Sequence, residues 1–281
     1  MAARTVKIGR LRVGEGEEML LVAGPCVIES AALCFRIAEA LRKVCARLGL
    51  PCVFKASFDK ANRTAAASFR GPGLEAGLRT LEEVRRRFEL PVLSDVHLPE
   101  QCAPAAQALD ALQIPAFLCR QTDLVVAAAR TGKPLNIKKA QFLAPEDMAQ
   151  VCAKARAAGN DRLLLTERGT AFGYHRLIND MTAVPRMQAL GCPVLFDATH
   201  SVQQPGGQGD RSGGERRMAI PLSLAAMAAG ADGLFLEVHP RPEKALSDAA
   251  CMLPLSALEP LLEKARRIRK IVLSAEFHKS V

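Results

Sequence analysis

The feature of this sequence that most limits its fold is the alternation of short apolar runs with helix-like segments. Eight runs have the composition of buried strands: LLVAGPC (20–26), CVFKAS (52–57), PVLSDV (91–96), ALQIPA (111–116), LNIKKA (135–140), LLLTER (163–168), PVLFDATH (193–200) and GLFLEVH (233–239). Between them, apolar residues recur every three or four positions, as in amphipathic helices. Apolar strands separated by helices are typical of a parallel sheet covered on both faces.

The number of these units favours one architecture. Eight strand–helix units in 281 residues match a (β/α)8 barrel, which typically takes about 250 residues. An open doubly wound sheet is the alternative, but no G-x-G-x-x-G motif follows the first strand, so its nucleotide-binding form is disfavoured. We predict an α/β protein: a single (β/α)8 TIM-barrel domain over residues 1–281, with a short N-terminal β-hairpin at residues 1–17 that closes the barrel floor.

Two of the helices have recognisable limits. The segment SAALCFRIAEALRKVCARLG (30–49) begins with Ser30, a preferred N-cap residue, and ends with Gly49, a preferred residue after a helix. A second helix is predicted within LEAGLRTLEEVRRRFEL (74–90).

Composition argues against several other classes of protein. The sequence contains no apolar run long enough for a membrane span, and its first residues lack the apolar stretch of a secretory signal. The nine cysteines include no C-x-x-C pair, so most of them are expected to be small buried side chains. The net charge of +9 comes without an aromatic–basic stacking surface, which favours anionic small molecules over nucleic acid as partners.

Each predicted strand ends in a polar or reactive residue. In chain order these residues are Cys26, Lys55, Asp95, Gln113, Lys138, Arg168, His200 and Glu237. Any one of them is explained by being the first exposed residue after a strand. All eight together indicate an active site, because barrel enzymes carry their chemistry at the C-terminal ends of the strands.

Five cations lie at or just after these strand ends: Lys55, Lys60, Arg63, Lys138 and Arg168. A phosphate carries roughly −1.5 to −2 at pH 7, so a phosphorylated carboxylate and a second phosphorylated molecule together bring about −5. The cations therefore predict a pocket for two strongly anionic substrates.

A second group, Cys26, His200, Glu237 and Asp248, combines a thiol, an imidazole and two carboxylates. These ligands suit a borderline divalent ion such as Zn²⁺, Fe²⁺, Mn²⁺ or Co²⁺. In a closed barrel the first, seventh and eighth strands are neighbours, so the four side chains can meet at one side of the mouth. Sequence spacing alone leaves this metal site open.

The segment HSVQQPGGQGDRSGGERR (200–217) is too glycine-rich for regular structure and follows a reactive strand end. It is either a mobile lid, with residues 206–214 at its centre, or an ordinary surface loop.

Seven stretches resemble the 3-deoxy-D-manno-octulosonate 8-phosphate synthase family. They are FKASFDKANRT (54–64), SFRGPGLEAGL (68–78), QIPAFLCRQTDL (113–124), NIKKAQF (136–142), ERGTAFGY (167–174), FDATHSVQQPGG (196–207) and LEVHPRPEKALSDAACMLPL (236–255). The resemblance implies a cytoplasmic (β/α)8 barrel, usually a homotetramer. Such an enzyme condenses phosphoenolpyruvate with D-arabinose 5-phosphate and water, releasing inorganic phosphate and a sugar acid used in lipopolysaccharide core synthesis.

The resemblance also implies roles for individual residues. Phosphoenolpyruvate binding falls on Lys55, Lys60, Gln113, Ala116, Lys138 and Arg168, and Ser57 joins the substrate-binding set. Sugar phosphate binding falls on Asn62, Arg63 and Thr64, of which Thr64 replaces the usual Ser. Phe117 and Arg120 match residues that reach a neighbouring subunit's site, and Arg176 replaces a usual Asn. The expected catalytic residues are Lys55, Lys60, Asp95, Lys138, His200 and Asp248.

The residue at position 26 distinguishes two branches of that family. One branch has Asn there and uses no metal, whereas the other has Cys and holds one divalent ion with Cys, His, Glu and Asp. With Cys26, His200, Glu237 and Asp248 the chain resembles the metal-dependent branch.

Two rival functions remain open. One is the related 3-deoxy-D-arabino-heptulosonate 7-phosphate synthase, which uses erythrose 4-phosphate and typically has K-P-R-T where this chain has K-A-N-R-T (60–64). The other is a non-catalytic barrel that binds sugar phosphates.

Overall fold

The computed structural model describes residues 4–207, 209 and 212–274. Its centre is a closed barrel of parallel strands, which confirms the predicted (β/α)8 fold. The strands are β3 (Leu20–Gly24), β4 (Cys52–Lys55), β5 (Val92–Asp95), β6 (Ala111–Ile114), β7 (Leu135–Lys138), β8 (Leu163–Glu167), β11 (Val194–Asp197) and β14 (Gly233–His239). Strand β14 pairs with both β11 and β3, and this pairing closes the ring.

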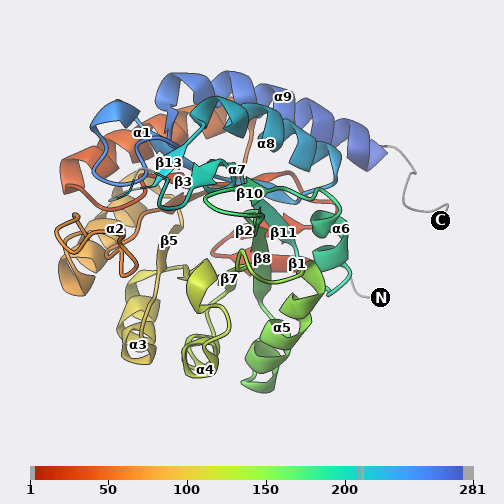
Figure 1. Cartoon of the computed structure of the whole chain (residues 1–281), viewed down its shortest axis with the longest axis horizontal. Helices are drawn as coiled ribbons and strands as arrows, with labels where there is room; N and C mark the ends of the chain where they lie inside the picture. Colours follow the sequence, from red (N-terminus) through yellow and green to blue (C-terminus); the bar gives the residue numbers. More distant parts are fainter. Residues whose placement is uncertain (1–3, 208, 210–211, 275–281) are drawn as a thin grey trace.

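A layer of helices surrounds the barrel, with α8 and α9 lying across one side of it (Figure 1). The helices are α1 (Ala31–Leu48), α2 (Leu74–Phe88), α3 (Pro99–Ala108), α4 (Thr122–Arg130), α5 (Met148–Ala157), α6 (Ala183–Gln188), α7 (Ala198–Ser201), α8 (Ala219–Ala228) and α9 (Leu255–Ser274). Short 3₁₀ turns occupy η1 (Ala116–Leu118), η2 (Pro145–Asp147), η3 (Arg216–Met218) and η4 (Pro242–Lys244). No helix in the described part of the chain is both long and apolar enough to cross a membrane.

Helix α1 has the predicted limits. The Ser30 hydroxyl accepts a hydrogen bond from the Leu33 amide at 3.2 Å. Gly49 follows the last turn with a φ of 64°, a left-handed conformation that glycine adopts without the steric cost of a side chain. The predicted second helix is α2, which begins at Leu74 and ends at Phe88.

The predicted N-terminal hairpin is present as β1 (Thr5–Ile8) and β2 (Leu11–Gly14), paired antiparallel. Val6, Ile8 and Val13 are buried and pack against the inward-facing side chains of the strands, among them Leu20 and Phe235. The hairpin therefore closes the barrel floor at the N-terminal ends of the strands. Residues 1–3 of the predicted extension lie outside the described residues.

The predicted seventh strand is too long. Strand β11 ends at Asp197, and His200 lies in the short helix α7. The cause is local: the Asp197 carboxylate accepts the backbone amide of His200 at 2.9 Å and caps a helical turn. At the same edge, Cys26 and Arg168 follow β3 and β8 instead of ending them.

The glycine-rich segment contains more regular structure than predicted. Strand β12 (Gln203–Gln204) pairs antiparallel with β13 (Gly213–Gly214), because the chain reverses between them and glycine permits the close backbone approach. Two further short pairs complete the fold: β9 (Thr170–Ala171) with β10 (Leu177–Ile178), and β15 (Leu253–Pro254) with β14. Residues 208, 210 and 211 of this segment lie outside the described residues.

All nine cysteines are buried free thiols, as the composition predicts for most of them.

Candidate active site at the mouth of the barrel

A cavity of about 680 Å³ opens at the C-terminal ends of the strands. Most of the predicted site residues line it: Lys55, Lys60, Asn62, Arg63, Thr64, Asp95, Gln113, Ala116, Phe117, Lys138, Arg168, His200 and Asp248. Cys26, Ser57 and Glu237 lie buried just beneath this lining. Arg120 is exposed and is not part of the lining in the single chain.

The lysines at the strand ends are buried beside carboxylates. Lys55, at the end of β4, is 1% exposed and donates to Glu237 Oε1 and to the Cys26 carbonyl, each at 3.1 Å. Lys138, at the end of β7, pairs with Asp197, and its ammonium lies 3.8 Å from the centre of the Phe235 ring. A buried ammonium is stable only with such partners, so these strand ends hold the lysines in defined positions.

Asp95 is the carboxylate at the centre of the pocket floor. It accepts hydrogen bonds from Ser57 and Gln113, and Lys55 and Lys60 lie 3.9 and 4.0 Å from its Oδ2. Burial alone raises the pKa of Asp95, but the two ammonium groups outweigh burial and hold the pKa well below its usual range. Asp95 is therefore ionised at neutral pH.

The pocket is less positive than its five cations suggest. Asp95, Asp197, Glu237 and Asp248 face them, and the pKa of each of these carboxyls is lowered by neighbouring positive groups despite burial. Five cations against four carboxylates leave a net charge of about +1. The sequence-based match between five positive charges and about −5 on two substrates was therefore too simple, because the carboxylates come from strands and loops that sequence analysis treated separately.

The thiol, imidazole and two carboxylates predicted as metal ligands come together. Ligand atoms of Cys26, Glu237 and Asp248 all lie within 4.8 Å of one another. His200 Nε2 adjoins this group, at 3.6 Å from both Glu237 Oε1 and Asp248 Oδ2. Residues from three strand ends and one following loop, up to 222 positions apart in the chain, thus converge on one point.

Two further observations fit a cation at this point. Glu237 Oε2 is buried and has no hydrogen-bond partner among the described residues. Burial, Asp248 and Glu237 raise the pKa of the Cys26 thiol well above its ordinary value, so the thiolate requires an added positive charge. A mixture of thiol, imidazole and carboxylate donors suits a borderline divalent metal ion.

The orientation of His200 is set by Asp197. Its Nδ1 donates to Asp197 Oδ2 at 2.7 Å, and because a carboxylate only accepts, Nδ1 carries the hydrogen. Nε2 is then the ring nitrogen that faces the two carboxylates. Sequence analysis missed Asp197, although FDATH shows an acid directly before His200.

Two other polar residues of the site were missed as well. Ser247 Oγ lies 2.9 Å from Cys26 Sγ and accepts from Arg63 Nη1 at 2.7 Å. Gln203 donates to Asp248 Oδ1 at 2.8 Å and accepts from Arg168 Nη2 at 3.0 Å. Ser247 directly precedes a predicted ligand, but only the folded chain brings Gln203 beside Asp248.

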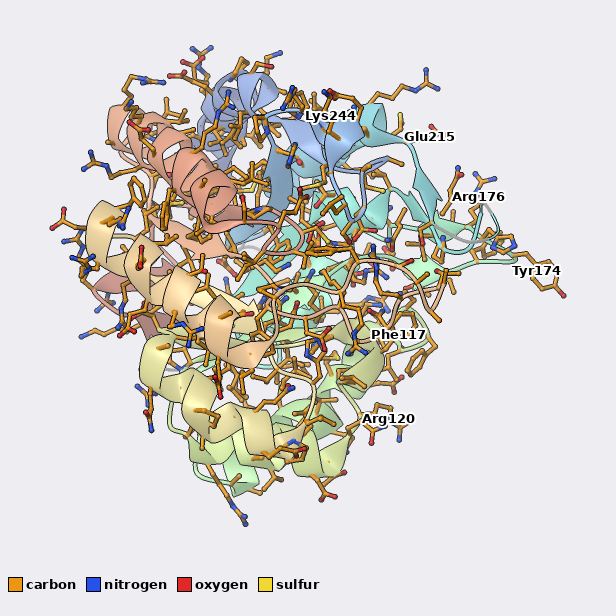
Figure 2. All side chains as sticks on the ribbon, turned by 90° about the vertical axis from the view of Figure 1, so that its left-hand side faces the viewer. Phe117, Arg120, Tyr174, Arg176, Glu215 and Lys244 are labelled. Atoms are coloured by element: carbon orange, nitrogen blue, oxygen red, sulfur yellow. The ribbon has the colours of Figure 1, made fainter. Side chains whose placement is uncertain are left out.

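The loop after β4 carries Asn62, Arg63 and Thr64 over the cavity. Besides Ser247, Arg63 binds the carbonyl of Leu246 at 2.9 Å, which joins this loop to the one after β14. Phe117 in η1 is 52% exposed at the cavity rim. Figure 2 shows Phe117 and Arg120 on the same face, with Tyr174 and Arg176 projecting farther outward.

These features define a (β/α)8-barrel protein whose mouth holds a cavity lined by lysine, arginine and carboxylate side chains, with a group of candidate metal ligands beside it. A model of the DAHP synthetase I family matches residues 3–274. The chain belongs to this family.

The chain is also similar to proteins that are each named 2-dehydro-3-deoxyphosphooctonate aldolase. The one from Syntrophobacter fumaroxidans is 60% identical over 252 residues, covering 90% of this chain and 88% of that protein. The one from Magnetococcus marinus is 54% identical over 279 residues, covering 98% and 97%. The one from Trichlorobacter lovleyi is 54% identical over 269 residues, covering 96% and 99%.

Proposed function

We propose that this protein condenses phosphoenolpyruvate with D-arabinose 5-phosphate and water. The products are 3-deoxy-D-manno-octulosonate 8-phosphate, used in lipopolysaccharide core synthesis, and inorganic phosphate. The observation that carries the proposal is that one cavity joins the buried cations of three strand ends to the loop bearing Asn62 and Arg63. This arrangement supports the binding of two anionic substrates side by side. The names of relatives at 54–60% identity favour this reaction over the heptulosonate synthase alternative.

The reaction forms one carbon–carbon bond and one carbon–oxygen bond from water, and it breaks the carbon–oxygen bond to phosphate; the proton lost by water balances the one gained by the aldehyde oxygen. C3 of the enol phosphate attacks the sugar aldehyde, water adds at C2, and the bond from C2 to the phosphate oxygen then breaks. Lys55, Lys138 and Arg168 would hold the carboxylate and phosphate of phosphoenolpyruvate, while Asn62, Arg63 and Thr64 would hold the sugar phosphate. Fixing both substrates at attack distance and offsetting their charges lowers the barrier.

The groups that could take part in proton transfer are buried titratable side chains, whose protonation depends on the charged residues around them. Asp95 is ionised, but its depressed pKa makes it a weak base, so its main role would be to hold the ammonium groups of Lys55 and Lys60 in place. Lys60 lies on the loop after β4, between Asp95 and Glu237. Its ammonium could donate a hydrogen bond to the aldehyde oxygen while that oxygen gains negative charge. His200 and Asp248 are the other candidates for handling protons.

The proposal includes one divalent metal ion, zinc, iron, manganese or cobalt, held by Cys26, His200, Glu237 and Asp248. The converging donors and the unpartnered Glu237 Oε2 support it. When bound, such an ion supplies positive charge that polarises or orients an oxygen of a substrate or of water.

The decisive experiment measures phosphate release from phosphoenolpyruvate with either arabinose 5-phosphate or erythrose 4-phosphate. We expect rapid release with the pentose phosphate and little with the tetrose phosphate. The reverse preference would support the heptulosonate synthase, and no release with either sugar would support a non-catalytic binding barrel.

The assembly proposed for the chain is a homotetramer in the cytoplasm, in which Phe117 and Arg120 reach the site of a neighbouring subunit. Exposed aromatic residues on loops that follow the strands support a contact there: Phe117 is 52%, Phe142 60%, Phe172 68% and Tyr174 97% exposed. Figure 2 shows Phe117 and Tyr174 on the same side of the molecule. Light scattering tests the mass of the assembly. Mixed oligomers of Arg120→Ala and Lys138→Ala subunits test sharing, because only a shared site regains activity on mixing.

A further inference from the structure

Every predicted metal ligand is joined to a cation of the substrate pocket by at most one side chain. Glu237 binds Lys55 directly. The other links run from His200 through Asp197 to Lys138, from Cys26 through Ser247 to Arg63, and from Asp248 through Gln203 to Arg168. The donor set and the anion-binding set are therefore one continuous polar network.

Gln203 carries no charge, so the effect of the hydrogen bonds that it makes can be measured separately from electrostatic attraction between the two sites. Its amide nitrogen donates to Asp248 Oδ1 at 2.8 Å, and its amide oxygen accepts from Arg168 Nη2 at 3.0 Å. A primary amide can donate to an anion and accept from a cation at the same time. A Glu at this position would keep the bond to Arg168 and repel Asp248, and an Ala would keep neither bond.

The same bridge lies at the base of the glycine-rich segment. Gln203 belongs to β12, whose backbone pairs with Gly214 in β13, and its side chain lines the cavity. Arg168 also donates to the backbone carbonyl of His200 at 3.1 Å, so the guanidinium that binds Gln203 has a second hydrogen-bond partner.

We propose that Gln203 is a positioning residue that couples the metal site to the substrate-anion site. With Gln203 in place, phosphoenolpyruvate on Arg168 orders Asp248, and a metal ion on Asp248 orders Arg168. Each ligand then tightens the binding of the other, and by thermodynamic linkage the two effects are equal. This inference rests on the proposed function, because it takes phosphoenolpyruvate and a divalent ion as the two ligands.

Attraction between the metal ion and the anionic substrate would itself produce some coupling. Gln203 is neutral, so its replacement by Ala leaves that electrostatic part intact and removes only the bridge. The neighbouring Gln204, which is exposed and belongs to the same two-residue strand, provides a matched control.

The experiment is a Co²⁺ titration of metal-stripped full-length protein, followed by the thiolate-to-cobalt absorption band, with and without saturating phosphoenolpyruvate. Phosphoenolpyruvate should tighten Co²⁺ binding of the wild type by roughly tenfold or more. In Gln203→Ala this factor should fall to about threefold or less, because the bridge is lost and only the direct attraction between the metal ion and the substrate anion remains. Gln204→Ala should retain the wild-type factor, and Gln203→Glu should bind phosphoenolpyruvate but show the reduced factor.

The outcomes separate this inference from the proposed function. The coupling role would be overturned if phosphoenolpyruvate tightened Co²⁺ binding as strongly in Gln203→Ala as in the wild type. It would also be overturned if phosphoenolpyruvate had no effect on Co²⁺ binding by the wild type. In both cases the metal site itself would still be supported. Failure of the wild type to bind Co²⁺ at all would overturn both the coupling role and the metal site, and the condensation reaction would still be decided by phosphate release. Because the readout is a ratio within one variant, a partly misfolded sample lowers the number of sites and leaves the ratio unchanged.

Discussion

Asp197 holds Nδ1 of His200 at 2.7 Å while it also pairs with the ammonium of Lys138. One fully buried carboxylate thereby orients a predicted metal ligand and a predicted phosphoenolpyruvate ligand. Such a carboxylate behind a metal-binding imidazole fixes the tautomer and the direction of the ring.

Replacement of Asp197 by Asn changes the shape of the side chain little, but it should lower catalytic efficiency strongly. We expect kcat/KM to fall by roughly 10- to 100-fold, because the uncharged amide leaves Lys138 unpaired and permits the wrong His200 tautomer. Steady-state kinetics and metal content measure the effect. Loss of thermal stability with unchanged kcat/KM would show that Asp197 only supports the fold.

Asp232 is a buried carboxylate at the opposite end of the barrel, and it serves as a comparison for Asp197 because its role is only to stabilise the fold. It is fully buried and accepts from Arg269 at 3.2 Å, from Gln188 at 2.9 Å and from the Val194 amide at 2.9 Å. Asp232→Ala should lower the free energy of unfolding by about 3–5 kcal/mol, because Arg269 is left as an uncompensated buried charge. Urea denaturation measures this loss. The folded fraction should retain wild-type kcat, and a selective loss of kcat would contradict the structural role.

Removal of bound metal should abolish activity. After treatment with a strong chelator, Mn²⁺, Co²⁺ or Zn²⁺ should restore phosphate release in the wild type. The Cys26→Ala variant should bind Co²⁺ without the thiolate-to-cobalt absorption band, because its single thiol donor is gone. Full activity in chelator-treated protein that contains no metal would refute the metal proposal.

Lys138→Ala should lose most catalytic efficiency. The ammonium lies buried at a strand end, where it can offset substrate charge, so kcat/KM should fall by about 100-fold or more. Lys43→Ala, on the exposed side of α1, should keep the wild-type value and controls for loss of a lysine. A decrease of only a few-fold in Lys138→Ala would mean that phosphoenolpyruvate binds elsewhere.

The loop that carries Asn62, Arg63 and Thr64 is braced by an ion pair between Asp59 and Arg70 (Arg70 Nε to Asp59 Oδ1, 2.8 Å). Arg70→Ala should raise KM for arabinose 5-phosphate several-fold and weaken phosphoenolpyruvate binding less, since Lys60 on the same loop keeps its ion pairs with Asp95 and Glu237. If the binding of arabinose 5-phosphate and of phosphoenolpyruvate were weakened equally, the proposed role of the Asp59–Arg70 pair in sugar phosphate binding would be contradicted.

The same pair should respond to acid. Partial burial raises the pKa of Asp59, but the hydrogen bond from Arg70 outweighs it and lowers the pKa below 3.8. Because the folded-state pKa is depressed, the stabilisation is present above about pH 4 and is lost as pH falls through that pKa. The stability difference between wild type and Arg70→Ala should therefore shrink in acid, as denaturation at pH 7 and pH 3 can measure.

Local sequence patterns determined the architecture and most of the site. Apolar runs of strand length, separated by amphipathic helices, specify a parallel barrel because each element must bury its apolar face against the next. Lys55, Asp95 and Lys138 end their strands, so their types and positions could be assigned without a structure. The direction of the barrel then places them at one mouth.

Only the tertiary structure decided how these groups are paired. The capping bond from Asp197 turns the chain before His200, the pocket carboxylates neutralise most of the cations, and Gln203 meets Asp248 across 45 residues. Such contacts depend on side-chain directions at a closed ring of strands, which sequence periodicity does not encode. The sequence therefore determined which chemical groups this protein brings to its site, and the folded barrel decided which of them act as one network.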